Sequence, residues 1–191
     1  MNNKIKVALI YGSTRKGRFC DKVGQWAAEQ IVNSDDFSLD VIDPAASLLQ
    51  PGAGTDEKAE SIPLQHRIAE ADAFVIVTPE YNHGYPAPLK ALIDSVGPEW
   101  QAKPVAFVSY GGVSGGLRAV EQLRLVFAEL HTVTIRDGVS FAGAWEQFDG
   151  AGVLLEPKRA RESMAILLAR LHWWGIALRN ARNAFPYLQK A

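Results

Sequence analysis

Three continuous apolar segments constrain this chain more than any other feature, because each is followed by a loop and then by a helical pattern. The segments are Ile5–Tyr11, Ala73–Thr78 and Pro104–Tyr110, each six or seven residues long and rich in Val, Ile and Phe. Runs of this length and content are typical of strands that are buried on both faces. Strands of this kind form parallel sheets that helices cover on both sides.

The rest of the chain alternates between helical and weaker strand patterns. Apolar spacing predicts helices over Gly17–Val32, Ile62–Ala71, the segment after Pro86, Gly115–Leu130 and Pro157–Asn183, strands over Leu39–Ile42 and Thr132–Ile135, and a loop over Pro44–Ser61. Five strands with right-handed crossovers predict an α/β fold, a flavodoxin-like doubly wound parallel sheet of order 2-1-3-4-5 with helices on both faces. The length of 191 residues suits one domain spanning residues 1–191.

Charge and cysteine content argue against several classes of protein. Lys and Arg number 20 against 21 Asp and Glu, so the formal net charge is −1 and nucleic-acid binding is not expected. The single cysteine, Cys20, favours a reducing, cytoplasmic location. No apolar run is long enough to span a membrane. The four histidines lack metal-ligand spacing, so we expect no metal site.

In a sheet of this order, ligands bind beyond the carboxyl ends of the strands, where the strand order reverses. Loop one (Gly12–Arg18) follows the first strand, and its N–H groups, its hydroxyls and Arg15 suit a phosphate. Gly12 and Gly17 have the spacing of a Walker A motif, but Arg18 and Phe19 stand where that motif requires Lys and Ser or Thr, which excludes a P-loop. Taken alone, loop one also fits an ordinary polar turn.

Two further loops should meet loop one at the same edge. Loop two (78–86) contains two tyrosines, a histidine and two prolines, a mixture that suits a planar ligand. Tyr81 or Tyr85 is a candidate to stack on a ring, and Asn82 to bind its polar edge. Loop three (109–116) has four glycines, which permit a ligand to approach the backbone closely. Alone, these loops also fit a rigid connection and a flexible helix entry, but together the three loops predict one cleft.

The residues of these loops resemble those of NAD(P)H-dependent FMN reductases, a flavodoxin-like family that includes azo-dye, quinone and chromate reductases. The resemblance covers about residues 4–140, and its matching stretches are Gly12-Ser13-Thr14-Arg15 with Gly17-Arg18, then Pro79-Glu80-Tyr81-Asn82 with Pro86, Leu89 and Lys90, then Ser109-Tyr110-Gly111-Gly112. It implies that Ser13 and Arg15 hold the FMN phosphate, that Pro79–Asn82 line the isoalloxazine ring, and that Tyr110–Gly112 pack against its other side. The full set of predicted cofactor-binding residues is Ser13, Thr14, Arg15, Gly17, Pro79, Glu80, Tyr81, Asn82, Ser109, Tyr110, Gly111 and Gly112.

The function that the resemblance implies is a ping-pong oxidoreductase, assembled as a homodimer or a dimer of dimers. NADPH or NADH would pass hydride to FMN, and free flavin, a quinone, an azo dye or a metal oxyanion would then take the electrons. The cofactor carries this chemistry, so no side chain is assigned as a catalytic acid or base. A flavodoxin-type electron carrier and a non-catalytic flavin-binding module remain alternatives. Arg15 and the near-neutral charge count against the electron carrier.

Three residues near the loops have more than one possible role. His83 is a candidate proton donor or a solvated loop residue. Arg118 is a candidate phosphate ligand or a solvated residue on a helix face. Cys20 lies in the first turn of a helix, where the pKa of a thiol can fall, but it also suits a small buried apolar position.

Overall fold

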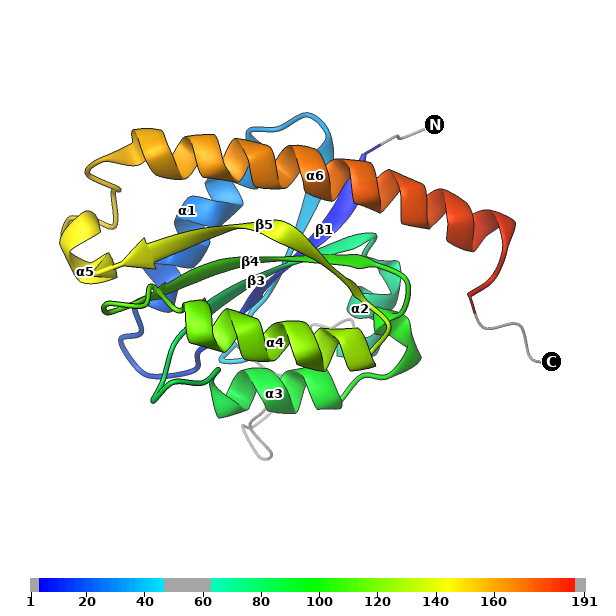
Figure 1. The fold of residues 1–191 in the computed structure, drawn as a ribbon, viewed down its shortest axis with the longest axis horizontal. Coiled ribbons are helices and arrows are strands. Elements are labelled where there is room, and N and C mark those ends of the chain that lie inside the picture. Colours follow the sequence, from blue (N-terminus) through cyan, green and yellow to red (C-terminus); the bar gives the residue numbers. More distant parts are fainter. Residues whose placement is uncertain (1–3, 47–62, 188–191) are drawn as a thin grey trace, which may run out of the picture.

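The sheet has the predicted topology in the computed structural model, which describes residues 4–46 and 63–187 (Figure 1). Its five strands are β1 (Ile5–Tyr11), β2 (Phe37–Ile42), β3 (Ala73–Pro79), β4 (Pro104–Gly111) and β5 (Val133–Ala142). All strand pairs are parallel, in the order β2-β1-β3-β4-β5. This order confirms the predicted flavodoxin-like fold and places the reversal of strand order between β1 and β3.

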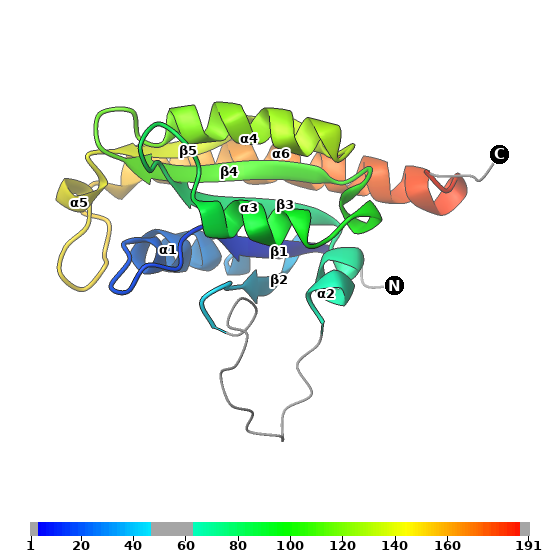
Figure 2. The ribbon, with the colours of Figure 1, turned by 90° about the horizontal axis from the view of Figure 1, so that it is seen from below.

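Helices cover both faces of the sheet (Figures 1 and 2). One face carries α1 (Cys20–Val32) and α6 (Pro157–Ala184), and the other carries α2 (Leu64–Glu70), α3 (Ala87–Asp94) and α4 (Leu117–Glu129). Two short helices, η1 (Pro98–Trp100) and α5 (Ala144–Gln147), lie in connections where the sequence pattern predicts none.

The central strands β3 and β4 are apolar except for Thr78 and Ser109, because both of their faces are buried. Along β3, Val75 and Val77 belong to the core against α1 and α6, whereas Phe74 and Ile76 belong to the core against α3 and α4. Successive side chains of a strand point to opposite faces, so a strand covered on both sides needs apolar residues at every position. Each such buried side chain contributes roughly 1.5–3 kcal/mol to stability. The buried strands therefore form a rigid support for the loops that follow them.

The last strand is longer than the sequence pattern predicts. The prediction of a strand over Thr132–Ile135 is wrong at its end, because β5 continues to Ala142. The register with β4 shifts partway along, so extra residues of β5 bulge out there. Arg124 of α4 donates hydrogen bonds to the carbonyl oxygens of Ile135 (2.8 Å) and Arg136 (3.1 Å) in this bulge. The polar Arg136–Gly138 stretch resembles a strand end in the sequence because it forms this bulge.

The segment between β2 and β3 is only partly described. The helix predicted over Ile62–Ala71 appears as α2, which begins at Leu64. Most of the loop predicted over Pro44–Ser61 lies outside the described residues. In the two described stretches of the chain, no helix has the length and the apolar character needed to cross a membrane.

Candidate active site at the carboxyl edge of the sheet

Loops one, two and three meet because the strands before them end side by side. Tyr11 of β1 pairs with Val77 of β3, and Pro79 of β3 pairs with Tyr110 of β4. Gly12 opens loop one, and its N–H donates to the Val77 carbonyl at 2.8 Å. A Cβ at Gly12 would lie only 2.8 Å from that same oxygen, so the close approach of loop one to β3 requires glycine. The three loops therefore surround the point where the strand order reverses.

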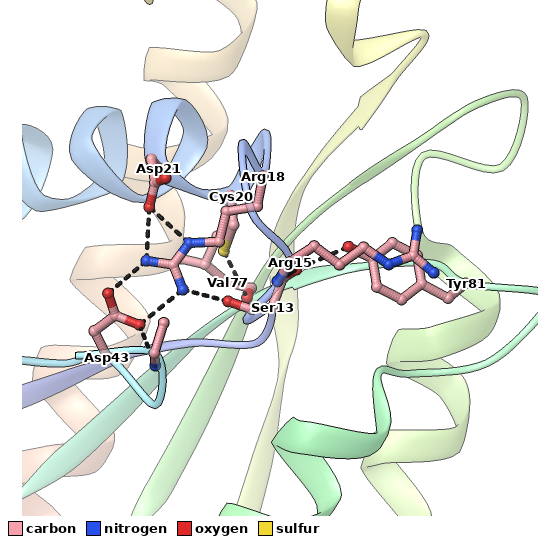
Figure 3. Close-up of polar contacts among 9 residues, drawn as sticks. Ser13, Arg15, Arg18, Cys20, Asp21, Asp43, Val77 and Tyr81 are labelled. Atoms are coloured by element: carbon pink, nitrogen blue, oxygen red, sulfur yellow. Dashed lines mark hydrogen bonds and ion pairs between the residues drawn. The ribbon is translucent and has the colours of Figure 1, made fainter. Parts of the chain in front are cut away.

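Arg18 fixes the shape of loop one (Figure 3). Its side chain is 8% exposed, and its guanidinium lies 2.7 Å from carboxylate oxygens of both Asp21 and Asp43. It also donates to the Ser13 carbonyl within loop one. Through Ser13 and Asp43, Arg18 connects loop one to the end of β2. The hydrogen bond with Asp43 is the main cause that raises the pKa of Arg18 above its ordinary value. Because its donors are committed to these partners, Arg18 is a structural residue of the loop.

Arg15 lies in the same loop without such partners. Its guanidinium carbon lies 3.6 Å from the centroid of the Tyr81 ring, and the Tyr81 hydroxyl is hydrogen bonded to the buried Ser13 Oγ at 2.8 Å (Figure 3). Within residues 4–46 and 63–187, Arg15 has no carboxylate partner, and the N–H groups of Thr14, Lys16 and Gly17 have no protein acceptor. A cation and several free N–H donors at a helix entry form a site for an anion.

Loop two forms a tight turn at the end of β3. Tyr81 and Gly84 exchange backbone hydrogen bonds of 2.9 and 3.1 Å, and the central residues Asn82 and His83 have φ values of 51° and 70°. Positive φ at both central positions defines a turn that Asn and His adopt more readily than most residues other than glycine. Gln122 of α4 donates to the His83 carbonyl at 2.9 Å and holds the turn from outside. The turn keeps Tyr81 in place beside loop one.

Glu80 does not extend freely from loop two. Its side chain is only 7% exposed, and its carboxylate accepts hydrogen bonds from Ser114 Oγ (2.6 Å), the Arg118 N–H (3.1 Å) and Arg118 Nη1 (2.6 Å). Burial acts to raise the pKa of this carboxyl, but the bonds from Ser114 and Arg118 outweigh it and hold the pKa below its ordinary value. Arg118, for which the sequence leaves a phosphate ligand and a solvated helix-face residue open, is half-exposed and pairs with Glu80.

Loop three contributes backbone to the cleft rather than large side chains. Tyr110 is 3% exposed and packs in the core beside Phe19, with ring centroids 5.9 Å apart. Ser109 Oγ donates to the Gly115 carbonyl at 2.8 Å and shapes the loop from within. A Cβ added at Gly112 would meet no atom within 4 Å, so the backbone there is open. Residues 109–111 are buried, so the part of the predicted stretch 109–112 that is left to a ligand is the backbone of Gly112.

One cavity borders loop one, and a second borders loop three. One of about 620 Å³ is lined by Thr14 and Lys16 of loop one together with Ala87, Pro88 and Ala91 of α3 and with residues 44–45. The other, of about 650 Å³, is lined by Val113 and Ser114 of loop three, by β5 and by the first turns of α6. Both volumes lie in the range typical of small-molecule sites.

Several residues were missed or given open roles by sequence reasoning. Asp43 and Gln122 were missed, although a carboxylate at the end of β2 is a signal for a partner in the neighbouring loop. The backbone carbonyl of His83 accepts the hydrogen bond from Gln122. Cys20 is fully buried, and burial raises the pKa of its thiol to about 11, so it is not an activated nucleophile.

Comparison with known proteins gives a consistent result. A family model described as NADPH-dependent FMN reductase matches residues 5–147. An NAD(P)H-dependent FMN reductase of Schizosaccharomyces pombe is 38% identical over 120 residues, which cover 58% of this chain but only 60% of that protein. An NAD(P)H:quinone oxidoreductase of Solanum tuberosum is 34% identical over 179 residues, covering 86% and 90%. The solved structure of a flavoenzyme, an NAD(P)H:(acceptor) oxidoreductase of Paracoccus denitrificans, has a TM-score of 0.63 at 24% identity, covering 89% and 97%.

Proposed function

Because the chain belongs to the NADPH-dependent FMN reductase family, we propose that it uses FMN and NAD(P)H to reduce small-molecule acceptors, quinones among them. The membership confirms the resemblance and the oxidoreductase class predicted from the sequence. The observation that carries the proposal is Arg15, which lies without a carboxylate partner in the described part of the chain and beside free N–H donors of loop one. This donor set matches a phosphate monoester.

The residues at the carboxyl edge fit the FMN molecule in two parts. A phosphate needs a cation and several N–H donors, which loop one provides. A flat tricyclic ring needs apolar surface and open backbone, which the partly exposed Tyr81 and the backbone around Gly112 provide. We assign the phosphate to Ser13, Thr14, Arg15 and Gly17, and the ring to the backbone and side chains of Pro79, Tyr81 and Asn82 with the backbone of Glu80 and residues 109–112.

The role of the protein in the proposed reaction is to bind and orient. When bound, FMN supplies the redox chemistry that takes hydride from NAD(P)H and returns electrons to an acceptor. The Glu80 N–H donates to the Tyr110 carbonyl at 3.2 Å, so the backbone N–H groups that would stabilise negative charge at the ring edge are those of loop three around Gly112. No side chain is assigned as a general acid or base. We propose that nucleotide and acceptor occupy the same open side of the cleft in turn, and that the chain works as a single domain in a homodimer.

The experiment that tests this function has two stages. Purified protein freed of flavin is titrated with FMN, and binding is followed by quenching of FMN fluorescence. NADPH or NADH oxidation at 340 nm is then measured with and without a soluble benzoquinone. We expect FMN binding, oxidation that depends on the quinone, and parallel lines in double-reciprocal plots.

The alternatives give different results in the same experiment. FMN binding without nucleotide oxidation would favour a flavodoxin-type carrier that receives electrons from a partner protein. Failure to bind FMN would overturn the assignment of Arg15 and loop one together with the reductase.

A further inference from the structure

The carboxylate of Glu80 is hydrogen bonded to the protein and not left free for a cofactor. It belongs to loop two, but all three of its hydrogen bonds go to loop three and to the start of α4. The side chain is 93% removed from solvent by these contacts, since 7% of it is exposed. A carboxylate with three donors around it is satisfied by the protein itself.

The bond to the Arg118 N–H makes Glu80 a cap for α4. Gly116, at the N-cap of that helix, has no side chain, so the first turn of α4 lacks a local cap. Glu80 supplies the missing acceptor from 38 residues earlier in the chain. A carboxylate at a helix N-terminus is favoured both by the free N–H groups and by the helix dipole. The helix start is therefore stabilised by loop two.

Ser114 extends this arrangement into loop three. Its Oγ donates to Glu80 at 2.6 Å and accepts from the Gly116 N–H at 3.3 Å. The second contact between α4 and loop two is the bond from Gln122 to the His83 carbonyl. Loop two is thus attached to α4 just before its turn, at Glu80, and within the turn, at His83. These bonds connect loop two to loop three at Ser114 and to the start of α4.

We propose that Glu80 is a positioning residue that acts through Ser114 and Arg118 to hold loops two and three in the geometry that receives the flavin ring. It does not touch the cofactor with its carboxylate. This inference rests on the proposed function, because its readout is the binding of FMN. It divides the role that the sequence predicts for Glu80: the backbone lines the ring, and the carboxylate holds the loops.

The test compares the affinity for FMN among variants of the full chain. Glu80→Gln and Arg118→Met are each expected to raise the Kd for FMN about tenfold, the effect of losing a hydrogen bond with a charged partner. The double variant is expected to match the single ones, because both changes break the same contact. Ser114→Ala should raise the Kd as well, whereas Ser114→Thr, which keeps the hydroxyl, should restore it. The visible absorbance spectrum of bound FMN should shift in the weakened variants.

The control is Glu121→Gln, a Glu-to-Gln substitution like Glu80→Gln, in α4, the helix that carries Arg118. The Glu121 side chain is 77% exposed and pairs with Arg124 at 3.5 Å, and none of its described contacts is with the three loops, so the Kd for FMN should not change. If Glu80 contacts FMN directly, Arg118→Met leaves the Kd unchanged or the effects of the two substitutions multiply, and the inference fails. If Glu80→Gln does not fold, Arg118→Met and the two Ser114 variants decide the question, since the Arg118 side chain is 49% exposed. Wild-type protein that does not bind FMN would instead refute the proposed function.

Discussion

The two edges of the sheet carry similar polar residues but differ in how those residues are satisfied. At the amino edge, Asp72 accepts hydrogen bonds from the Lys6 N–H (3.1 Å), Arg179 (3.0 Å) and Arg182 (3.4 Å). Lys103, 5% exposed, donates to two carbonyl oxygens at the end of α2 at 2.8 and 2.7 Å. At the carboxyl edge, Arg15 and several N–H groups of loop one lack such partners in the part of the chain that the structure describes.

This difference separates a structural role from a binding role. Buried polar groups in folded proteins are nearly always hydrogen bonded, so a satisfied cluster needs no ligand to explain it. Donors that converge without acceptors imply that the acceptor comes from outside the chain. The amino edge therefore holds the fold together, and the carboxyl edge is the place where a ligand completes the hydrogen bonds. Each edge can be tested by removing one residue.

The largest effect is expected from Asp72→Ala at the amino edge. The Asp72 side chain is 15% exposed, and its loss leaves Arg179 and Arg182 without their acceptor. Removing one partner of a largely buried charge cluster costs about 3–5 kcal/mol, so the free energy of unfolding in urea should fall by about that amount. Asp94→Ala, which breaks the exposed pair with Lys90 at 2.6 Å, should cost less than about 1 kcal/mol. Equal costs for the two variants would show that the amino edge is not held by its polar contacts.

A somewhat smaller effect is expected from the pH dependence of stability at Lys103. Burial, followed by the positive charge of Arg182, lowers the pKa of Lys103 from 10.5 to about 8. Between these two pH values the unfolded chain binds more protons than the folded one, so the free energy of unfolding rises with pH. The gain amounts to at most about 3 kcal/mol between pH 8 and 10.5.

The comparison with Lys103→Met isolates this contribution. The stability of the wild type relative to the variant should increase from pH 8 to 10.5 in urea denaturation followed by circular dichroism. A difference that stays constant over this range would mean that the carbonyl acceptors of Lys103 keep its pKa near the ordinary value.

At the carboxyl edge, Arg15→Met tests the free donors directly. Loss of a charge-assisted hydrogen bond to phosphate should cost about 2 kcal/mol, so the Kd for FMN should rise roughly 30-fold. The unfolding of the flavin-free protein should change little, because Arg15 contributes only an exposed cation–π contact of about 0.5–1 kcal/mol. Arg170→Met, an exposed arginine of α6, is the matched control and should leave the Kd unchanged. A large loss of stability without a change in Kd would mean that Arg15 has a structural role and not a binding role.

Sequence reasoning predicts some parts of the fold and of the site better than others. The strands follow from their apolar runs, and loop one from the polar residues directly after β1, because both signals are local in the chain. The β5 bulge could not be predicted, since Arg136–Gly138 is a strand segment only through its contacts with Arg124 and β4. The role of Glu80 depends on Ser114 and Arg118, which lie 34 and 38 residues away. Partners so distant become visible only when the strands are placed in register.

Tyr110 illustrates a further limit of prediction. Its place in a glycine-rich motif favours contact with a ligand, yet its side chain points into the core with Val108 and Ala106. Residues two apart on a strand share a face, so Tyr110 must follow these neighbours. The alternation fixes which residues share a face, but it does not say which side of the strand end faces the cleft. Gly112, two residues further on, is exposed, so the contact of this motif with a flavin ring is a proposal that involves the backbone of Gly112.

The smallest effect is expected at Cys20, which lies at the carboxyl edge but resembles the amino edge in being satisfied. It is fully buried, its Sγ lies 3.8 Å from the Val77 carbonyl, and burial raises the pKa of the thiol to about 11. A protonated, inaccessible thiol does not react, so iodoacetamide at pH 8 should modify the native protein far more slowly than the urea-denatured protein. Cys20→Ala should change the Kd for FMN by less than about twofold. Rapid modification that is blocked by FMN would contradict this prediction. It would mean that Cys20 is accessible and that the FMN site includes the first turn of α1.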